Sequence, residues 1–228
     1  MGMAMDNIFI STIYLLLTFA LTILCFKKYG KYGLYIWMCV LVIISNIQTI
    51  KIAEVFNLTI SLGNISYGAL FLTTDILSEK YGKKATDNAT KFSFIIMVVF
   101  SILMYIFLQY KPSDIDSSQN ALMVVFGYIP RITFASLSAF YISQRCDAYL
   151  YKILKQKYNK IWISNNVSTI ISQTIDTLLF VFISFTGIMD LKNMFQLIIT
   201  MLLFKWVIAL LDTPFMILTA KINNNELE

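Results

Sequence analysis

The sequence contains no histidine among its 228 residues. Histidine is the commonest general base near neutral pH and a frequent metal ligand, so its absence argues against sites of both kinds. The three cysteines, Cys25, Cys39 and Cys146, lie in or beside apolar runs and lack the spacing of a metal site. We expect them to be small core residues. The chain is therefore expected to hold no metal and no cofactor.

Charged residues are also scarce, at 14% of the chain, whereas hydrophobic residues make up 58% and the mean hydropathy is +0.71. An ordinary soluble domain carries about 25% charged residues, so this composition excludes that class. The apolar runs can cross about 30 Å of hydrocarbon, which takes about 20 helical residues. No alternating pattern of the barrel type recurs along the chain. These features predict an all-α, polytopic membrane helical bundle.

Several catalytic motifs are missing as well. The chain has no glycine-rich phosphate loop, which excludes an ATP-driven pump within this single chain, and no Ser-His-Asp set. We expect no catalytic residues, and keep as an alternative a membrane-embedded enzyme that uses Asp147 and Asp176 as an acid pair. The net charge of +5 comes from lysines in short loops between apolar runs. That pattern indicates membrane orientation and not a nucleic-acid partner.

Strong membrane spans are predicted over 8–26, 34–50, 92–109, 121–151, 161–187 and 194–220, with a weaker one over 62–79. The run 8–26 has neither a basic leader nor a small-residue cleavage site, so we expect a first span and not a removed signal peptide. No change in composition marks a second domain. Residues 1–228 are therefore predicted to form a single integral membrane domain.

The placement of the lysines decides between two topologies. The lysines form three clusters. The first cluster follows the first span and contains Lys27, Lys28 and Lys31, and the second follows the weak segment and contains Lys80, Lys83, Lys84 and Lys91. The third lies between the spans 121–151 and 161–187 and contains Lys152, Lys155, Lys157 and Lys160. All three clusters share one side of the membrane only if 62–79 crosses it. We therefore predict about seven transmembrane segments, with the amino terminus outside. The alternative is six spans plus a re-entrant segment, which would place the second cluster outside.

Polar residues line one face of the predicted helix over 161–187. At about 100° per residue they fall within an arc of roughly 140°, and they are Asn165, Ser168, Thr169, Ser172, Gln173 and Asp176. An acid inside a span is energetically costly and is usually functional. The preceding span repeats the pattern Ser-Gln-x-x-Asp, with Gln144 and Asp147 in the positions of Gln173 and Asp176. We predict similar chemistry from both helices.

Arg131 offers a partner for the buried acid. It lies about ten residues from the outer end of its span, and Asp176 lies about eleven from the outer end of its own, so the two reach similar depth at 1.5 Å per residue. An isolated charge at that depth costs several kcal/mol. An Arg131–Asp176 ion pair is therefore our hypothesis for how the acid is tolerated.

Further polar residues lie in two earlier spans. Asp75 and Glu79 stand one helical turn apart in the weak segment, and Asn46 and Lys51 lie nearer the outer side. For single serines, threonines and amides within a bundle we favour a role in joining helices. For Asp75 and Asp176 we favour function. Glu79 lies near the inner interface, where a solvated helix end explains it equally well.

Four stretches of the chain, between about residues 40 and 190, carry a further pattern: "SNIQTIK", "LTTDILSEKYGKKA", "RITFASLSAFYISQRCD" and "NNVSTIISQTIDTLLFVFISFTG". In order and spacing they resemble the motifs of the queuosine precursor transporter family. The resemblance implies a multi-pass transporter of the bacterial inner (cytoplasmic) membrane. It also implies uptake of 7-cyano-7-deazaguanine, 7-aminomethyl-7-deazaguanine or queuine for tRNA modification.

By the same resemblance, the substrate-binding residues are Asn46, Lys51, Asp75, Glu79, Arg131, Gln144, Asp147, Ser168, Thr169, Gln173 and Asp176, and Ser136 also matches a motif. A guanine-like edge presents a ring N–H and an amine, which a carboxylate such as Asp176 accepts together. Tyr67 or Phe71 can cover the ring face, although packing is their favoured role. The alternative function is a substrate-binding subunit of a multi-component, ATP-driven vitamin-type importer. A coupling ATPase partner and self-association both stay open.

Overall fold

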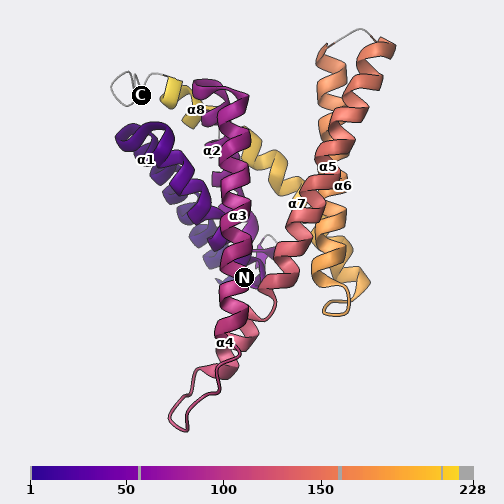
Figure 1. The fold of residues 1–228 in the computed structure, drawn as a ribbon. Helices are drawn as coiled ribbons and strands as arrows, with labels where there is room; N and C mark the ends of the chain where they lie inside the picture. The colour runs from indigo at the N-terminus through magenta and orange to yellow at the C-terminus, as the bar shows by residue number, and fades with distance from the viewer. Residues whose placement is uncertain (1, 56–57, 159–160, 212, 221–228) are drawn as a thin grey trace. The chain divides into compact units, whose positions relative to one another are not determined.

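The structure, a computed structural model, describes residues 2–55, 58–158, 161–211 and 213–220 (Figure 1). Most of these residues are helical, which confirms the prediction of an all-α polytopic membrane bundle. The elements in chain order are α1 (Gly2–Thr49), β1 (Ile52–Val55), β2 (Leu58–Ser61), α2 (Gly63–Tyr81), α3 (Lys83–Phe107), α4 (Gln119–Phe126), α5 (Ile129–Tyr158), α6 (Ile161–Phe185), α7 (Leu191–Leu211) and α8 (Thr213–Ala220).

Within the described residues, four helical stretches are long and apolar enough to cross a membrane: Asn7–Thr49, Lys83–Phe107, Gln119–Ser143 and Val167–Phe185. The first of these contains two predicted spans, because α1 turns at Gly30, where φ is 55° and ψ is −135°. Glycine adopts such a conformation without a Cβ clash. The two arms of α1 pack against each other, and Trp37 Nε1 donates to Thr22 Oγ1 across them at 2.9 Å.

The chain divides into two compact units. Unit 1 contains the described residues of Met1–Pro130 and Leu203–Glu228, and unit 2 contains Arg131–Leu202. Unit 1 therefore includes α1 to α4, the strands and α8, whereas unit 2 includes nearly all of α5, α6 and the first part of α7. The expectation of a single domain over residues 1–228 stays a prediction.

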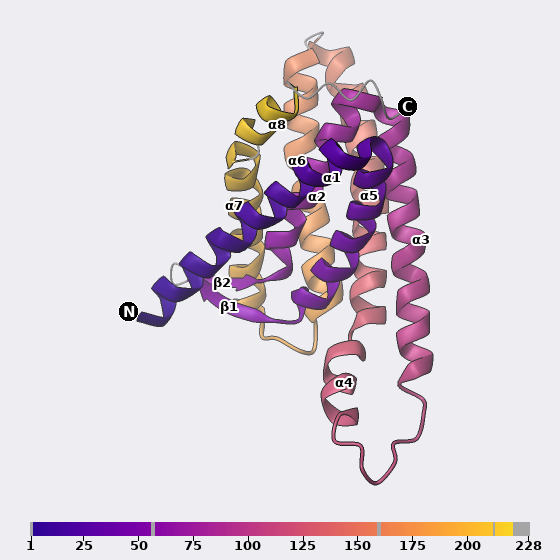
Figure 2. The ribbon, with the colours of Figure 1, turned by 90° about the vertical axis from the view of Figure 1, so that its left-hand side faces the viewer.

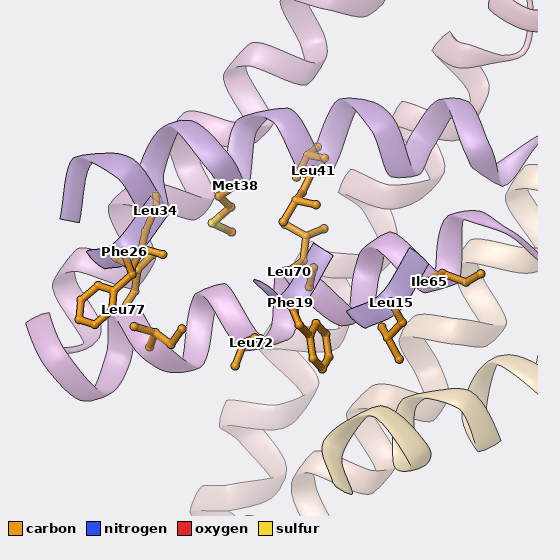
Figure 3. Close-up of a cluster of buried hydrophobic side chains, with 14 of the residues drawn as sticks. Leu15, Phe19, Phe26, Leu34, Met38, Leu41, Ile65, Leu70, Leu72 and Leu77 are labelled. Atoms are coloured by element: carbon orange, nitrogen blue, oxygen red, sulfur yellow. The ribbon is translucent and has the colours of Figure 1, made fainter. Parts of the chain in front are cut away.

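The apolar core of unit 1 lies between α1 and α2 (Figure 3). Its buried side chains include Leu15, Phe19, Phe26, Leu34, Met38, Leu41, Ile65, Leu70, Leu72 and Leu77. Helix α2 also packs against α3 and α8, and its buried small residues, such as Gly68 and Ala69, allow close approach of its neighbours. Because α2 faces protein on several sides, it needs fewer apolar residues than a span that faces lipid. This explains the weak signal over 62–79.

Helix α2 has 19 residues, which span about 28 Å at 1.5 Å per residue. That length suits a crossing of the membrane, but its composition does not place it among the four apolar stretches. The crossing by 62–79, and with it the choice between about seven spans and six, stays a prediction.

Unit 1 contains a β-hairpin that was not predicted from the sequence. Residues 52–61 lie between the predicted spans 34–50 and 62–79, and there β1 and β2 pair antiparallel, with Ile52 opposite Ser61 (Figure 2). The backbone N–H of Leu62 donates to the carbonyl oxygen of Lys51 at 3.0 Å and closes the base of the hairpin. The signal was present, because two short runs rich in β-branched residues flank a two-residue link that contains asparagine.

Unit 2 is built on α5, α6 and the first part of α7. Helices α6 and α7 are in contact through the rings of Phe182 and Phe195, whose centroids lie 6.2 Å apart. Helix α6 ends at a turn that contains Gly187, with a φ of 79°, and there the N–H of Ile188 donates to the carbonyl of Phe185 at 3.0 Å. Glycine favours this left-handed conformation at a helix end. This turn sets the orientation of the last carbonyl groups of α6.

Candidate functional site

Asp176 lies on α6 and faces Ser143 of α5. The Ser143 hydroxyl oxygen is 3.3 Å from Oδ1 of Asp176 and 3.0 Å from the carbonyl oxygen of Phe140. The hydroxyl has one proton for these two acceptors, so the carboxylate shares this donor with the α5 backbone. Ser143 is buried and Asp176 is half-buried. The acid therefore has a polar contact across the helix pair and retains some accessibility.

The buried polar face of α6 is narrower than the sequence predicts. Ser168 and Ser172 are both buried, and with Asp176 they recur every four residues, so all three line one side of the helix. Gln173 is half-buried and Thr169 is exposed. The side chains of three further predicted residues lie outside the described residues: Gln144, Asp147 and Asn165.

The hypothesis of an Arg131–Asp176 ion pair is wrong. Arg131 instead donates from Nε to the carbonyl oxygen of Ile183 at 2.7 Å and from Nη2 to that of Thr186 at 2.5 Å. Ile183 lies seven residues beyond Asp176, which is about 10 Å along the helix. The carbonyl groups at a helix C-terminus carry partial negative charge and lack helical partners, so they suit a guanidinium. Arg131 therefore binds the end of α6 to the start of α5.

In unit 1, Asn46 is buried at the end of α1, and its Nδ2 donates to the carbonyl oxygen of Val42 at 2.7 Å. Lys51 follows α1 and is exposed, as are Asp75 and Glu79 on α2. Helix α1 is in close contact with the start of α2. The Asn46 amide thus donates a hydrogen bond within its own helix. The three charged residues predicted as substrate contacts in unit 1 are accessible to solvent or to a ligand.

The four predicted residues of unit 1 do not form one cluster. A Cβ added to Gly63, at the start of α2, would collide with Thr49 Oγ1, so the last turn of α1 lies beside that end. Asp75 lies twelve residues further along α2, which is about 18 Å. Glu79 is one turn further still. The Asn46 end and the Asp75 end of unit 1 are therefore separate polar regions.

A ring of three hydrogen bonds in unit 1 was missed. Gln48 Nε2 donates to the Tyr14 hydroxyl at 2.9 Å, the Tyr14 and Ser66 hydroxyls are 3.0 Å apart, and the Ser66 hydroxyl donates to Gln48 Oε1 at 2.7 Å. Each hydroxyl can then donate once and accept once, with Tyr14 donating to Ser66. The signal was a tyrosine within an apolar run, since a buried tyrosine hydroxyl usually finds a partner.

Three buried polar atoms lack a hydrogen-bond partner within the described part of the chain: Asn64 Nδ2, Thr133 Oγ1 and Ser184 Oγ. Thr133 follows Arg131 by two residues, and Ser184 follows Ile183 directly. A buried polar group without a partner costs free energy, so such positions are worth testing as ligand contacts. Neither hydroxyl was predicted from the sequence to be a site residue, because threonine and serine are common in packed helices.

The aromatic residues suggested for the ring face, Tyr67 and Phe71, pack against the core of unit 1. This agrees with packing as their favoured role. The three cysteines are free and half-buried. Among the described residues, no group of three or more histidine, cysteine, aspartate or glutamate side chains is placed to hold a metal ion.

Comparisons with known proteins give a consistent result. A family model described as "Putative vitamin uptake transporter" matches residues 61–219. A relative from Bacillus subtilis (strain 168), named "Probable queuosine precursor transporter", is 32% identical over 216 residues, which cover 93% of this chain and 94% of the relative. No solved structure matches the chain. The family match includes every predicted site residue except Asn46 and Lys51, which precede it.

Proposed function

We propose that this chain, which belongs to the vitamin uptake transporter family, imports queuosine precursors into the cell. The chain is a multi-pass transporter of the bacterial cell membrane, and its substrate is a small molecule. The observation that carries the proposed cargo is the name of the Bacillus subtilis relative, whose similarity extends over 93% of this chain. We expect 7-cyano-7-deazaguanine and 7-aminomethyl-7-deazaguanine as cargo, with queuine as the third candidate.

The guanine-like edge of the cargo is proposed to bind at Asp176. Its ring N–H and exocyclic amine donate together to a carboxylate, which forms a strong, charge-assisted pair. Support comes from the position of Asp176, which is half-buried and lies against the Ser143 hydroxyl. Gln173, one turn earlier and also half-buried, offers an amide for the cargo's carbonyl group.

The remaining motif residues stay proposed substrate contacts: Asn46, Lys51, Asp75, Glu79, Gln144, Asp147, Ser168 and Thr169. For Arg131 we propose a positioning role, because its guanidinium bonds the end of α6. Helix α6 carries Asp176, so this bond contributes to the placement of the proposed binding acid.

The test is uptake by bacterial cells that can neither make nor import deazaguanines, scored as queuosine in tRNA after each precursor is fed. The intact chain should restore queuosine, and Asp176→Asn should lose at least tenfold, since it cannot provide the two equivalent acceptors of a carboxylate. Asp114→Asn, an exposed acid in the loop before α4, is the matched control and should behave as the intact chain. Membrane levels of each protein are measured in parallel. An inserted intact chain that delivers none of the precursors would contradict the proposed cargo.

The purified chain separates the alternatives. We propose that it needs no ATPase, so proteoliposomes that contain the chain alone should accumulate the precursor. Binding without uptake would favour the substrate-binding subunit of an ATP-driven importer. We also propose that it is not an enzyme, and incubation in detergent should return the precursor unchanged. Chemical conversion of the precursor would instead favour the acid-pair enzyme.

A further inference from the structure

The tetrapeptide Lys-Tyr-Gly-Lys occurs twice in unit 1, at residues 28–31 and 80–83. The first copy joins the two arms of α1, and the second joins α2 to α3. The glycine of each copy has a positive φ, 55° at Gly30 and 79° at Gly82. Glycine reaches these conformations without the steric cost that other residues incur. The same four residues therefore form a junction between two helical segments at both places.

The two turns lie side by side. The rings of Phe26, just before the first turn, and Tyr81, within the second, meet edge to face with centroids 6.4 Å apart. The hydroxyl of Tyr35, just after the first turn, donates to the carbonyl oxygen of Ala85 at 2.9 Å. Both views of the ribbon place the turns at the same end of unit 1 (Figures 1 and 2). Sequence-distant lysines thus gather on one surface.

We define the lysine collar as the five lysines of this surface that have no carboxylate partner among the described residues: Lys27, Lys28, Lys31, Lys83 and Lys84. All are exposed except Lys31, which is half-buried. Two of them lie over tyrosine rings instead, Lys28 at 5.2 Å from the centroid of Tyr29 and Lys31 at 5.8 Å from that of Tyr35. The exposed acids Glu79 and Asp87 are near in sequence, yet neither forms an ion pair with the collar.

We propose that the lysine collar binds the head groups of anionic phospholipids. Its unpaired ammonium groups complement phosphate, and it lies where apolar helices end, which is the depth of lipid head groups. Tyr29 and Tyr32 are 55% and 69% exposed, and tyrosine is enriched at that depth because its ring is apolar and its hydroxyl is polar. Exposed tyrosines between exposed lysines therefore favour a lipid surface over an acidic protein partner. The proposal does not depend on which cargo is carried.

The test is native mass spectrometry of the full chain in detergent, with phosphatidylglycerol or phosphatidylcholine added at equal concentration. The intact chain should retain phosphatidylglycerol preferentially. The variant Lys28→Gln/Lys83→Gln, which removes one charge from each turn, should bind it about 25-fold more weakly, at about fivefold per lysine. The matched control is Lys111→Gln/Lys192→Gln, which removes two exposed lysines outside the collar, one in the loop before α4 and one in the first turn of α7. It should keep the affinity of the intact chain.

Raising the salt concentration should reduce phosphatidylglycerol binding to the intact chain and have less effect on the collar variant, because fewer charges remain to be screened. Equal retention of the two lipids would overturn the proposal. So would equal loss of phosphatidylglycerol in the collar variant and the control variant. If the collar variant keeps its lipid but loses a co-purifying acidic protein, the surface is a protein-docking site and the lipid proposal fails.

Discussion

Arg131 illustrates at the residue scale how a cation is accommodated inside a helical bundle. Its guanidinium bonds two carbonyl groups at the end of α6, those of Ile183 and Thr186. These groups have no helical N–H to accept from, because the helix ends there. A planar guanidinium provides several donors in a fixed arrangement and can serve both carbonyls at once. The same two hydrogen bonds give the guanidinium its acceptors and give the two carbonyl groups at the helix end their donors.

We predict that Arg131→Ala lowers the free energy of unfolding by roughly 2 kcal/mol, because it removes two charge-assisted hydrogen bonds. Arg131→Lys should recover only part of this loss, since an ammonium group cannot copy the guanidinium geometry. The measurement is reversible unfolding in mixed detergent micelles. Arg131→Ala and Asp176→Ala should be additive, because the two side chains do not pair. If the loss in the double variant differs from the sum of the two single losses by more than about 1 kcal/mol, Arg131 and Asp176 do interact and the ion-pair hypothesis holds.

Asp116 in the loop before α4 gives a prediction of pH dependence. Its carboxylate accepts hydrogen bonds from the Ser118 hydroxyl at 2.6 Å and the Ser118 N–H at 2.7 Å, and these lower the pKa of Asp116 below its usual 3.8. The charged form is therefore favoured in the folded loop. Its stabilisation is fully present above pH 3.8 and is lost as the pH falls through the lowered folded pKa.

The hydrogen-exchange protection factor of the Ser118 amide should accordingly fall at acidic pH in the intact chain. Asp116→Asn keeps an acceptor but has no titrating group, so its protection should not change with pH over this range. A native loop whose Ser118 protection is constant down to pH 2 would show that the carboxylate does not hold the turn.

The residue-scale predictions from sequence succeeded where local chemistry was sufficient. Asp176 was recognised as an unusual polar group in an apolar run, and it does have a polar partner across the helix pair. The predicted partner, Arg131, was wrong because the depths of Arg131 and Asp176 were estimated by counting residues from the ends of their helices. Arg131 and Asp176 match in that count, but the pairing offset between α5 and α6 brings Arg131 to Ile183 instead. Helix offset depends on packing, which the spacing of polar residues does not specify.

At the element scale, α2 is the helix on which unit 1 is organised. Its sequence reads as a weak span because it buries small and polar residues, such as Ser66 and Thr73, against neighbouring helices. Hydropathy measures the preference of side chains for lipid, so it does not detect a helix that is enclosed by protein. The hairpin of β1 and β2 was missed for a related reason. Two strands of four residues are too short to stand out beside spans of about 20.

The hydrogen-bond ring of Tyr14, Gln48 and Ser66 joins both arms of α1 to α2, so it should behave as a unit. Ser66→Ala leaves the Gln48 carbonyl group and the Tyr14 hydroxyl without this partner, and we expect a loss of roughly 1–3 kcal/mol in unfolding free energy. Tyr14→Phe should cost a similar amount. The double variant should cost clearly less than the sum, since the second change acts on a ring already broken.

The control for the ring is Ser78→Ala, an exposed serine on the same helix, which should stay within about 0.5 kcal/mol of the intact chain. The measurement is again unfolding in mixed micelles. Additive losses from Ser66→Ala and Tyr14→Phe would mean that the three side chains act separately. The α1–α2 contact would then depend on apolar packing alone.

At the scale of the whole molecule, the predicted topology of about seven spans places the lysine collar inside the cell and the loop at 110–118 outside. In a variant with Cys25, Cys39 and Cys146 replaced by alanine, Asp114→Cys should react with a membrane-impermeant thiol reagent on intact cells. Asp87→Cys should react only after the membrane is opened. Six spans plus a re-entrant 62–79 would reverse both results, because α2 would return to the side it left. The experiment thus decides whether the buried, weakly apolar α2 crosses the membrane. Its control is uptake of a precursor by the cysteine-free parent, which shows that this protein is in its functional fold.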